Sequence, residues 1–270
     1  MKMKNISLLL LTLALFCISV CSQNVEQIQF VLRWPQTYCN KDPKPKVKCD
    51  KIPPLKFTLD GFWGTDSNGK ILQGCTDTEK RDWKIVLHTT MATKLNNFWP
   101  SLTEQEPIDM WKEAWNTYGT CIIRTFKGPT QYFNRADRLA GEIGDLLQHH
   151  LINSDGIVPC DSATYNNGEI LNSFKKVSNN QELSFTCKKI NSTHAYLDQV
   201  TFCYDQKDPR NIVSCLSSVT SHRCLVQNII VPRPSPPTRA FISADSSMTG
   251  EKLRPNSIWE ILRMTSRDDD

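Results

Sequence analysis

The sequence predicts an α+β fold, in which helices pack against an antiparallel sheet and disulfides stabilise the domain. Strand-like alternation occurs near the N-terminus, at residues 27–32 and 57–64, and again toward the C-terminus, at residues 183–189, 194–204 and 223–231. Helical patterns fill the region between these two groups of strands. Nine cysteines follow an N-terminal secretory segment, which is typical of a disulfide-stabilised extracellular domain.

Residues 1–22 have the pattern of a secretory signal peptide. Lys2 and Lys4 supply its positive start, and residues 6–20 form an apolar stretch that is too short to span a membrane. We therefore expect a secreted protein, extracellular or vacuolar through the secretory route, that has no membrane anchor. Removing the two lysines lowers the formal net charge from +4 to +2, which is too small to indicate a nucleic-acid partner.

Residues 23–232 are expected to form one domain, and residues 233–270 a proline-rich linker with a disordered C-terminal tail. The segment 233–270 carries six basic and six acidic residues and few apolar ones, so it cannot bury a core of its own. Within the domain, Asn191-Ser192-Thr193 is a glycosylation sequon. The secretory route makes this sequon usable, so we expect a glycan at Asn191.

The first strand, Gln27–Leu32, is expected to enter the core and to end at Trp34-Pro35. Prolines and lysines fill the segment between Cys39 and Cys49. A short run of charge is usually solvated surface, so we prefer a basic surface loop to a loop that contacts phosphate.

Asp60 lies in the second strand, residues 57–64. Alternation along this strand places Asp60 on the face opposite to the apolar side chains at positions 57 and 59. Helical patterns follow at residues 77–95 and 104–118, and another lies at residues 169–177.

The helix predicted at residues 104–118 is the centre of the domain. Trp111 and Trp115 are four residues apart and therefore lie on one face, which we expect to pack into the core. Glu113 and Thr117 form a second pair at the same spacing, offset by two residues, so they project from a different face. Gly119 ends the helix, and the face that carries Glu113 is expected to line a cleft.

A long helix is predicted at residues 131–150. The histidines of the chain are scattered and form no metal-binding motif. His149 and His150 at its end are expected to make a favourable contact with the helix dipole or to form a surface pair. The chain has no Cys-x-x-Cys motif, so neither a zinc site nor any other metal or cofactor is expected. The expected apolar side of this helix consists of Leu139, Ile143, Leu146 and Leu147.

The strongest functional signal comes from short segments in a fixed order. They are Trp34-Pro35-Gln36-Thr37-Tyr38-Cys39, Phe57-Thr58-Leu59-Asp60-Gly61-Phe62-Trp63, Phe98-Trp99-Pro100-Ser101-Leu102, Trp111 to Cys121 and Gly156-Ile157-Val158-Pro159. Together these segments resemble the characteristic blocks of the ribonuclease T2 family, the secreted acid ribonucleases that include the plant S-RNases and S-like RNases. The resemblance covers about residues 25 to 232.

This resemblance implies a ribonuclease T2-like fold and a set of disulfides. One cysteine, Cys160, is then left as a free thiol. It could join two chains through an intermolecular disulfide, although a lone cysteine is more often buried and inert, and we expect a monomer. The implied disulfides are Cys39–Cys49, Cys75–Cys121, Cys187–Cys224 and Cys203–Cys215.

The resemblance also implies a chemistry for which this chain lacks the side chains. In the family, one histidine takes the proton of the ribose 2′-hydroxyl and another protonates the leaving 5′-oxygen, while a glutamate, a lysine and a further histidine stabilise the charged intermediate. The framework residues of the two active-site blocks remain, namely Trp63, Trp111, Trp115, Gly119, Thr120 and Cys121. The family's catalytic positions are all substituted and are predicted to be non-functional: they hold Asp60, Glu113, Ala114, Thr117 and Tyr118.

Several functional hypotheses follow. Without imidazoles to move protons, and with carboxylates where the phosphate would lie, RNA cleavage is predicted to be absent or very weak. A pair formed by Asp60 and Glu113 could instead act as a glycoside hydrolase pair or bind a hard cation, but drifted positions in an inactive cleft are the simpler interpretation.

The leading hypothesis is a non-catalytic storage or defence protein, or one that binds RNA weakly or an unidentified protein partner. Trp34, Tyr38 and Trp63 are the candidates for stacking on RNA bases, although a place in the core is the preferred interpretation of all three. The alternative is an active endoribonuclease that forms 2′,3′-cyclic phosphate ends with unusual catalytic groups.

Overall fold

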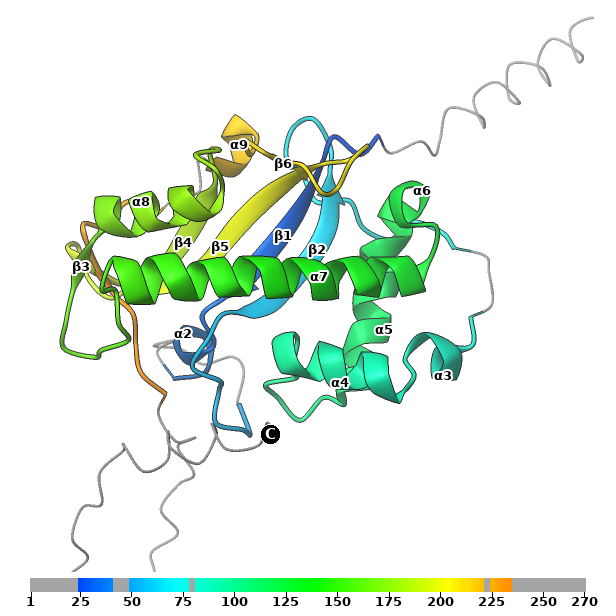
Figure 1. Ribbon diagram of the computed structural model, residues 1–270, viewed down its shortest axis with the longest axis horizontal. Helices are drawn as coiled ribbons and strands as arrows, with labels where there is room; N and C mark the ends of the chain where they lie inside the picture. Colours follow the sequence, from blue (N-terminus) through cyan, green and yellow to red (C-terminus); the bar gives the residue numbers. More distant parts are fainter. Residues whose placement is uncertain (1–23, 41–48, 78–80, 221–223, 235–270) are drawn as a thin grey trace, which may run out of the picture. The chain divides into compact units, whose positions relative to one another are not determined.

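The computed structural model describes residues 24–40, 49–77, 81–220 and 224–234 (Figure 1). The predicted signal peptide, the basic loop at 41–48 and residues 235–270 of the predicted tail lie outside the described residues. The strands are β1 (Gln27–Arg33), β2 (Thr58–Thr65), β3 (Tyr165–Asn166), β4 (Ser184–Lys189), β5 (His194–Asp205), β6 (Ile212–Val213) and β7 (Asn228–Ile230). The α-helices are α2 (Pro35–Asn40), α3 (Trp83–Val86), α4 (Thr89–Phe98), α5 (Pro107–Thr117), α6 (Ile123–Phe126), α7 (Pro129–Leu147), α8 (Asn167–Val177) and α9 (Ser217–Thr220), and wider or tighter helical turns form η1 (Gly119–Ile122) and η2 (Gln148–Ser154).

All seven of these strands form one sheet in the order β2-β1-β5-β7-β3, with β4 and β6 also paired to β5. β1 lies between β2 and β5, antiparallel to both, and every residue of it except Arg33 is buried. The expected α+β architecture is therefore present. The expectation of a purely antiparallel sheet is wrong, because β7 runs parallel to β5 along His194–Tyr196.

The last strand is also shorter than predicted, since only Asn228–Ile230 of residues 223–231 forms a strand. The disulfide between Cys187 in β4 and Cys224 fixes where the chain returns to the sheet. From that point the returning segment lies along the first residues of β5, where its direction is parallel.

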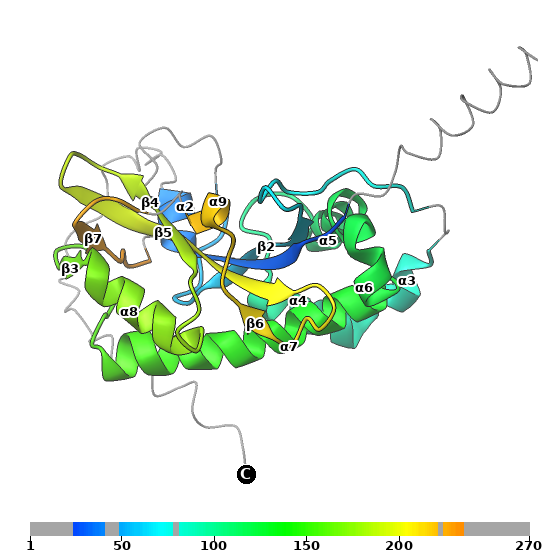
Figure 2. The ribbon, with the colours of Figure 1, turned by 90° about the horizontal axis from the view of Figure 1, so that it is seen from above.

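The long helix α7 lies across one face of the sheet (Figures 1 and 2). Leu146 was predicted on its apolar side but is 39% exposed, because it lies at the flank of the stripe. The helix continues into the wider turns of η2, so His149 and His150 are not at a helix end, and they form a surface pair with ring centroids 4.9 Å apart. The stripe that packs on the sheet consists of Tyr132, Phe133, Ala136, Leu139, Ile143 and Leu147.

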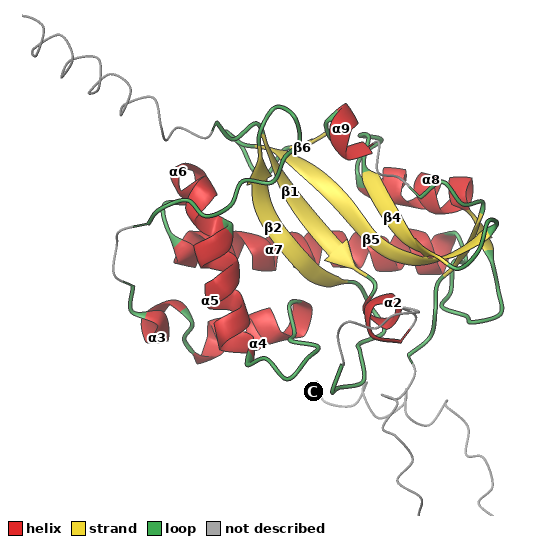
Figure 3. Cartoon of the chain, turned by 180° about the vertical axis from the view of Figure 1, so that it is seen from behind, coloured by secondary structure: helices red, strands yellow, loops and turns green. Residues whose placement is uncertain are grey.

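Two predicted helices have different boundaries in the structure. The stretch 77–95 is not one helix, because His88 caps a new helix by accepting a hydrogen bond on Nδ1 from the Met91 amide, so α3 and α4 are separate. The central helix starts at Pro107 instead of residue 104, as expected for a proline at the first helical position. Figure 3 shows α4 and α5 beside the β2 edge of the sheet.

β4 and β5 form the predicted antiparallel pair, joined by a turn at Asn191. The Asn191 side-chain oxygen accepts hydrogen bonds from the amides of Thr193 (2.9 Å) and His194 (2.8 Å), which fixes the turn. Asn191 is exposed. A glycan there, as the sequon predicts, would meet no packed surface.

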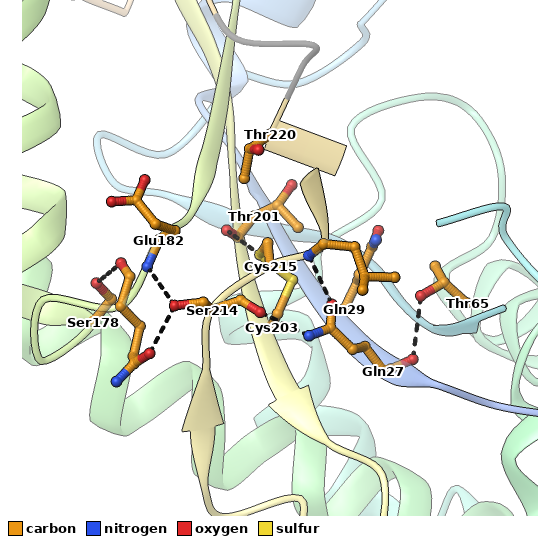
Figure 4. Close-up of a disulfide and its surroundings, with 12 residues drawn as sticks. Gln27, Gln29, Thr65, Ser178, Glu182, Thr201, Cys203, Ser214, Cys215 and Thr220 are labelled. Carbon is orange, nitrogen blue, oxygen red and sulfur yellow. Dashed lines mark hydrogen bonds between the residues drawn. A yellow bond between two sulfur atoms is a disulfide. The ribbon is translucent and has the colours of Figure 1, made fainter. Parts of the chain in front are cut away.

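Four disulfides join Cys39–Cys49, Cys75–Cys121, Cys187–Cys224 and Cys203–Cys215, the same pairs that the family resemblance implies. Figure 4 shows the last of these beside Gln27 of β1. The Gln27 amide donates to the Ser214 carbonyl (2.7 Å), and its oxygen accepts from the Leu216 amide (3.0 Å), so β1 holds the segment that carries Cys215.

Cys160 is a free thiol and is partly exposed. Of the helices that the structure describes, none is long and apolar enough to cross a membrane.

Candidate functional site

A cleft of about 260 Å³ lies between α5, the loop that follows α4, and the adjoining ends of β1, β2 and α2. Figure 3 shows α2 at the end of β1 and α5 beside β2. The structure brings all five predicted catalytic positions into the lining of this one cleft, namely Asp60, Glu113, Ala114, Thr117 and Tyr118.

The central helix α5 presents these positions because its opposite face is fixed in the core. Trp111 and Trp115 are buried, and the Trp111 indole donates a hydrogen bond to the Trp99 carbonyl (2.9 Å). Past the end of α5, a Cβ on Gly119 would lie 2.3 Å from the Trp115 ring, so this position admits only glycine unless the indole moves. The disulfide from Cys121 to residue 75 then anchors the turn.

Asp60 projects into the cleft because β2 carries a β-bulge at this residue. Val31 of β1 pairs with Gly61, and the next residue, Leu32, pairs with Leu59, so Asp60 has no partner in β1. A bulge of this kind turns a side chain out of the regular alternation. The bulge gives Asp60 its position at the cleft wall.

Arg33 is the main residue of the site that sequence analysis missed. The register places it between Thr58 of β2 and Gln199 of β5. Its guanidinium makes an ion pair with Asp60 (Nη1 to Oδ1, 2.7 Å), with the two side chains 22% and 17% exposed. The amide of Gln199 donates to the other carboxylate oxygen of Asp60 (2.5 Å). The charge of Asp60 is therefore met from within the domain.

A second irregularity brings another acid to this group. In β5, Gln199 pairs with Thr186 of β4 but Leu197 pairs with Cys187, so Asp198 also lies at a bulge. Burial raises the pKa of Asp60, Arg33 opposes this, and the charge of Asp198 raises it further. Asp198 and Gln199 are adjacent polar residues inside the apolar strand pattern of residues 194–204. This interruption of the pattern was the signal that could have indicated both residues.

Tyr38 also lines the cleft, and it carries two cations on its ring. The Arg33 guanidinium lies 4.1 Å from the ring centroid and the Lys188 ammonium lies 5.9 Å from it. Both distances are within the range of cation–π attraction. Of these two cations, Arg33 lines the cleft, where it is held by both Tyr38 and Asp60.

Glu113 occupies the exposed rim of the cleft and accepts a hydrogen bond from Gln105 (3.1 Å). The acid whose charge acts on Asp60 is Asp198, and Glu113 is not among the groups that perturb it. The proposed carboxylate pair of Asp60 and Glu113 therefore receives no support from the electrostatics of the site.

The other two aromatic candidates have different roles. Trp34 is 1% exposed and donates a hydrogen bond to the Pro232 carbonyl (2.9 Å), so it is the core residue that the preferred interpretation made it and does not line the cleft. Trp63 is bonded to Gln29 (2.9 Å) and packs on the ring of Tyr118 with centroids 5.3 Å apart. Trp63 is not in the cleft lining, and it supports Tyr118 from behind.

The described histidines, His88, His149, His150 and His194, all lie outside the cleft lining. Within the described ranges, no group of three or more histidine, cysteine or acidic side chains is placed to hold a metal ion. The groups that the cleft offers to a ligand are therefore cations, carboxylates, hydroxyls and aromatic rings.

Comparison with known proteins gives consistent results at the level of sequence and of fold. The model of the ribonuclease T2 family matches residues 25–215. Ribonuclease S-1 of Pyrus pyrifolia is 25% identical over 205 residues, which cover 76% of this chain and 86% of that protein.

Among solved structures, RNase NT in complex with 5′-AMP superposes with a TM-score of 0.65 at 23% identity, covering 79% of this chain and all (100%) of that one. Human RNase T2 superposes with a TM-score of 0.61 at 20% identity, covering 78% and 100% of the two chains. At these identities, the structural likeness establishes the fold alone.

Proposed function

This chain belongs to the ribonuclease T2 family, and from that premise we propose that it is a secreted, non-catalytic member of the family. The single observation that carries the proposal is the composition of the cleft. Its lining includes all five positions that the family resemblance assigns to catalytic groups, and none of the described residues that line it is a histidine. Proton transfer from the ribose 2′-hydroxyl and to the leaving oxygen then has no group with a suitable pKa in place.

The charges of the cleft support the same proposal. A phosphodiester is an anion, and an active site for it presents cations that are free to bind it. Here Arg33 is already paired with Asp60 at 2.7 Å. An entering phosphate would have to break this ion pair and would leave the Asp60 carboxylate beside it.

Secretion is supported by the four disulfides, which form and persist in oxidising compartments, and by the signal-peptide pattern of residues 1–22. The role of such a protein would rest on abundance or binding, as for a storage, defence or recognition protein. An active endoribonuclease with unusual catalytic groups remains the alternative that the experiment below decides.

The decisive experiment incubates the purified protein with labelled RNA from acid to neutral pH and detects 2′,3′-cyclic phosphate ends. An active family member serves as the positive control. We expect no cleavage above the level of a buffer blank. Cleavage at an appreciable rate by the natural protein would overturn the proposal.

A reconstructed variant tests whether the fold is intact around the lost chemistry. It carries Asp60→His, Glu113→His, Ala114→Glu, Thr117→Lys and Tyr118→His. Because Asp60→His leaves Arg33 without its carboxylate, the reconstruction is made with and without Arg33→Gln. We expect cleavage to return more strongly in the variant that also carries Arg33→Gln. The reason is that a neighbouring cation lowers the pKa of an imidazole.

A binding role is a second candidate, favoured by the aromatic ring of Tyr38 with two cations over it. RNase NT is a structural neighbour seen with 5′-AMP, which makes a nucleotide the first ligand to test here. Calorimetric titration with 5′-AMP should give weak binding that Tyr38→Ala abolishes. Equal heats from the natural protein and the variant would refute a nucleotide site at Tyr38.

A further inference from the structure

A second cavity, of about 330 Å³, lies between α4, α7 and the residues that directly precede β2, and shares no lining residue with the cleft. Figure 1 shows α4 running below α7. Its size falls within the range of pockets that hold small molecules. We infer that it is a binding site for a small, mainly apolar molecule that carries one anionic group.

The walls determine the apolar part of this ligand. Trp34, Phe57 and Phe98 contribute aromatic surface, and Leu32, Leu147 and Leu151 contribute aliphatic surface. Several of these side chains belong to the main core, so the cavity is an extension of the core that reaches the surface. Such a wall favours a ligand whose body is a ring system or a short aliphatic chain.

The cavity is open on its α7 side because two of the α7 residues that line it are glycines. Gly141 and Gly144 lie on that side of the helix, and a Cβ built on either would meet no atom within 4 Å. Glycine is the least favourable helix residue after proline, and neither glycine here has a positive φ that would require it. Two glycines in a helix interior, both facing the same empty space, keep this cavity open.

The polar groups at the mouth determine the charge of the ligand. Lys56 donates to the side chain of Asn97 (2.7 Å), a neutral group, and no ion pair of Lys56 is formed among the described residues. Asp137, which also lines the cavity, is neutralised by Lys94 (3.0 Å). Lys56 therefore carries a positive charge that no described carboxylate pairs with.

The remaining charged group at the mouth is Asp145, which lies on α7 eight residues after Asp137. At a rise of 1.5 Å per residue, this is about 12 Å farther along the helix. The ligand is oriented with its acidic group toward Lys56 and its apolar body against Trp34.

Fluorescent probes test this assignment directly. Anilinonaphthalene sulfonate has an apolar ring system with one anionic group, and phenylnaphthylamine has the same rings without the sulfonate. We expect the natural protein to bind the sulfonate probe at one saturable site. Failure to reach saturation with one probe per chain would overturn the inference.

Two variants locate the site. Gly144→Leu places a side chain in the empty space and should weaken both probes at least tenfold without lowering the melting temperature. Gln131→Leu adds the same side chain at an exposed position of α7 outside the cavity, and it should leave both affinities unchanged. Undiminished probe binding in a folded Gly144→Leu variant would place the site elsewhere and refute the inference.

Lys56→Gln tests the charge. It should weaken the sulfonate probe about tenfold and leave phenylnaphthylamine unaffected. Equal effects on the two probes, or no effect on either, would refute the assignment of an anionic group. Because Lys56 is exposed, this variant should fold even if Gly144→Leu does not.

Discussion

Replacing Arg33 by methionine is expected to lower the free energy of unfolding by about 3 kcal/mol at neutral pH. At the observed 2.7 Å between Arg33 and Asp60, the gross attraction is about 6 kcal/mol for an effective dielectric constant of 20. Desolvation of both groups offsets much of this attraction. Removing only the cation leaves the carboxylate in place with a neighbouring acid, Asp198, which is why the loss is large.

The sign of the pH dependence follows from the pKa of Asp60. Burial raises this pKa in the folded protein above its ordinary value of 3.8, and Arg33 opposes the shift. Loss of Arg33 raises the pKa of Asp60 further. Because the folded state then binds the proton more tightly than the unfolded chain, the variant recovers relative stability as the pH falls. Its deficit should be full at pH 7 and should shrink toward pH 4.

Urea denaturation of both proteins across this pH range measures the effect, and a double-mutant cycle isolates the pair. Arg33→Met combined with Asp60→Asn should be less destabilised than the sum of the two single changes. Arg210→Met is the matched control, since Arg210 makes a similar ion pair with Asp208 (2.9 Å) while the two side chains are 74% and 49% exposed. The control should show no resolvable change. A deficit independent of pH, or additive single changes, would contradict a direct interaction between Arg33 and Asp60.

Three further predictions concern the frame of the domain. Replacing Cys75 and Cys121 together by serine opens a bridge of 46 residues and should cost about 4 kcal/mol of stability, measured by denaturation of the oxidised proteins. Asp155→Asn should cost under about 1 kcal/mol of stability at pH 7 and nothing near pH 2. The reason is that the hydrogen bond from Lys176 lowers the pKa of Asp155, so the stability that this carboxylate contributes is lost as the pH falls below the ordinary value of 3.8. Equal losses at both pH values would contradict this. Gly61→Ala should cost about 1–3 kcal/mol in a thermal melt, since its Cβ would lie 1.5 Å from the indole two residues later, and an unchanged melting temperature would show that this indole moves freely.

Much of the frame could be predicted because it depends on local pattern. The spacing of Trp111 and Trp115 determines which side of α5 is buried, and both are buried as expected. The same spacing argument places Glu113 and Thr117 on another face, and both line the cleft. Periodicity and a family resemblance were sufficient for these residues, because each depends on its own helix.

The parts of the site that were missed depend on register between strands. Arg33 follows an apolar strand directly, and nothing in its neighbourhood distinguishes it from a solvated strand end. Its role appears only when β2 and β5 are both paired to β1, with bulges at Asp60 and Asp198. The sequence of one strand does not indicate where a bulge occurs, because a bulge is one extra residue relative to the partner strand. That extra residue shifts the pairing register by a single position, which becomes visible only when both strands are paired.

The bulge at Asp60 separates the geometry of this site from its chemistry. The backbone irregularity aims residue 60 into the cleft whichever side chain occupies the position, because the pairings of Gly61 and Leu59 with β1 fix it. A histidine there would point at the same space as the aspartate does. The aspartate differs because its carboxylate lies at hydrogen-bonding distance from Arg33 and Gln199. These two contacts satisfy the charge of the cleft without a ligand. A cleft that satisfies its own charges has little electrostatic attraction left for a phosphodiester. This supports our proposal that the protein retains the ribonuclease T2 fold while its function depends on surfaces other than this cleft.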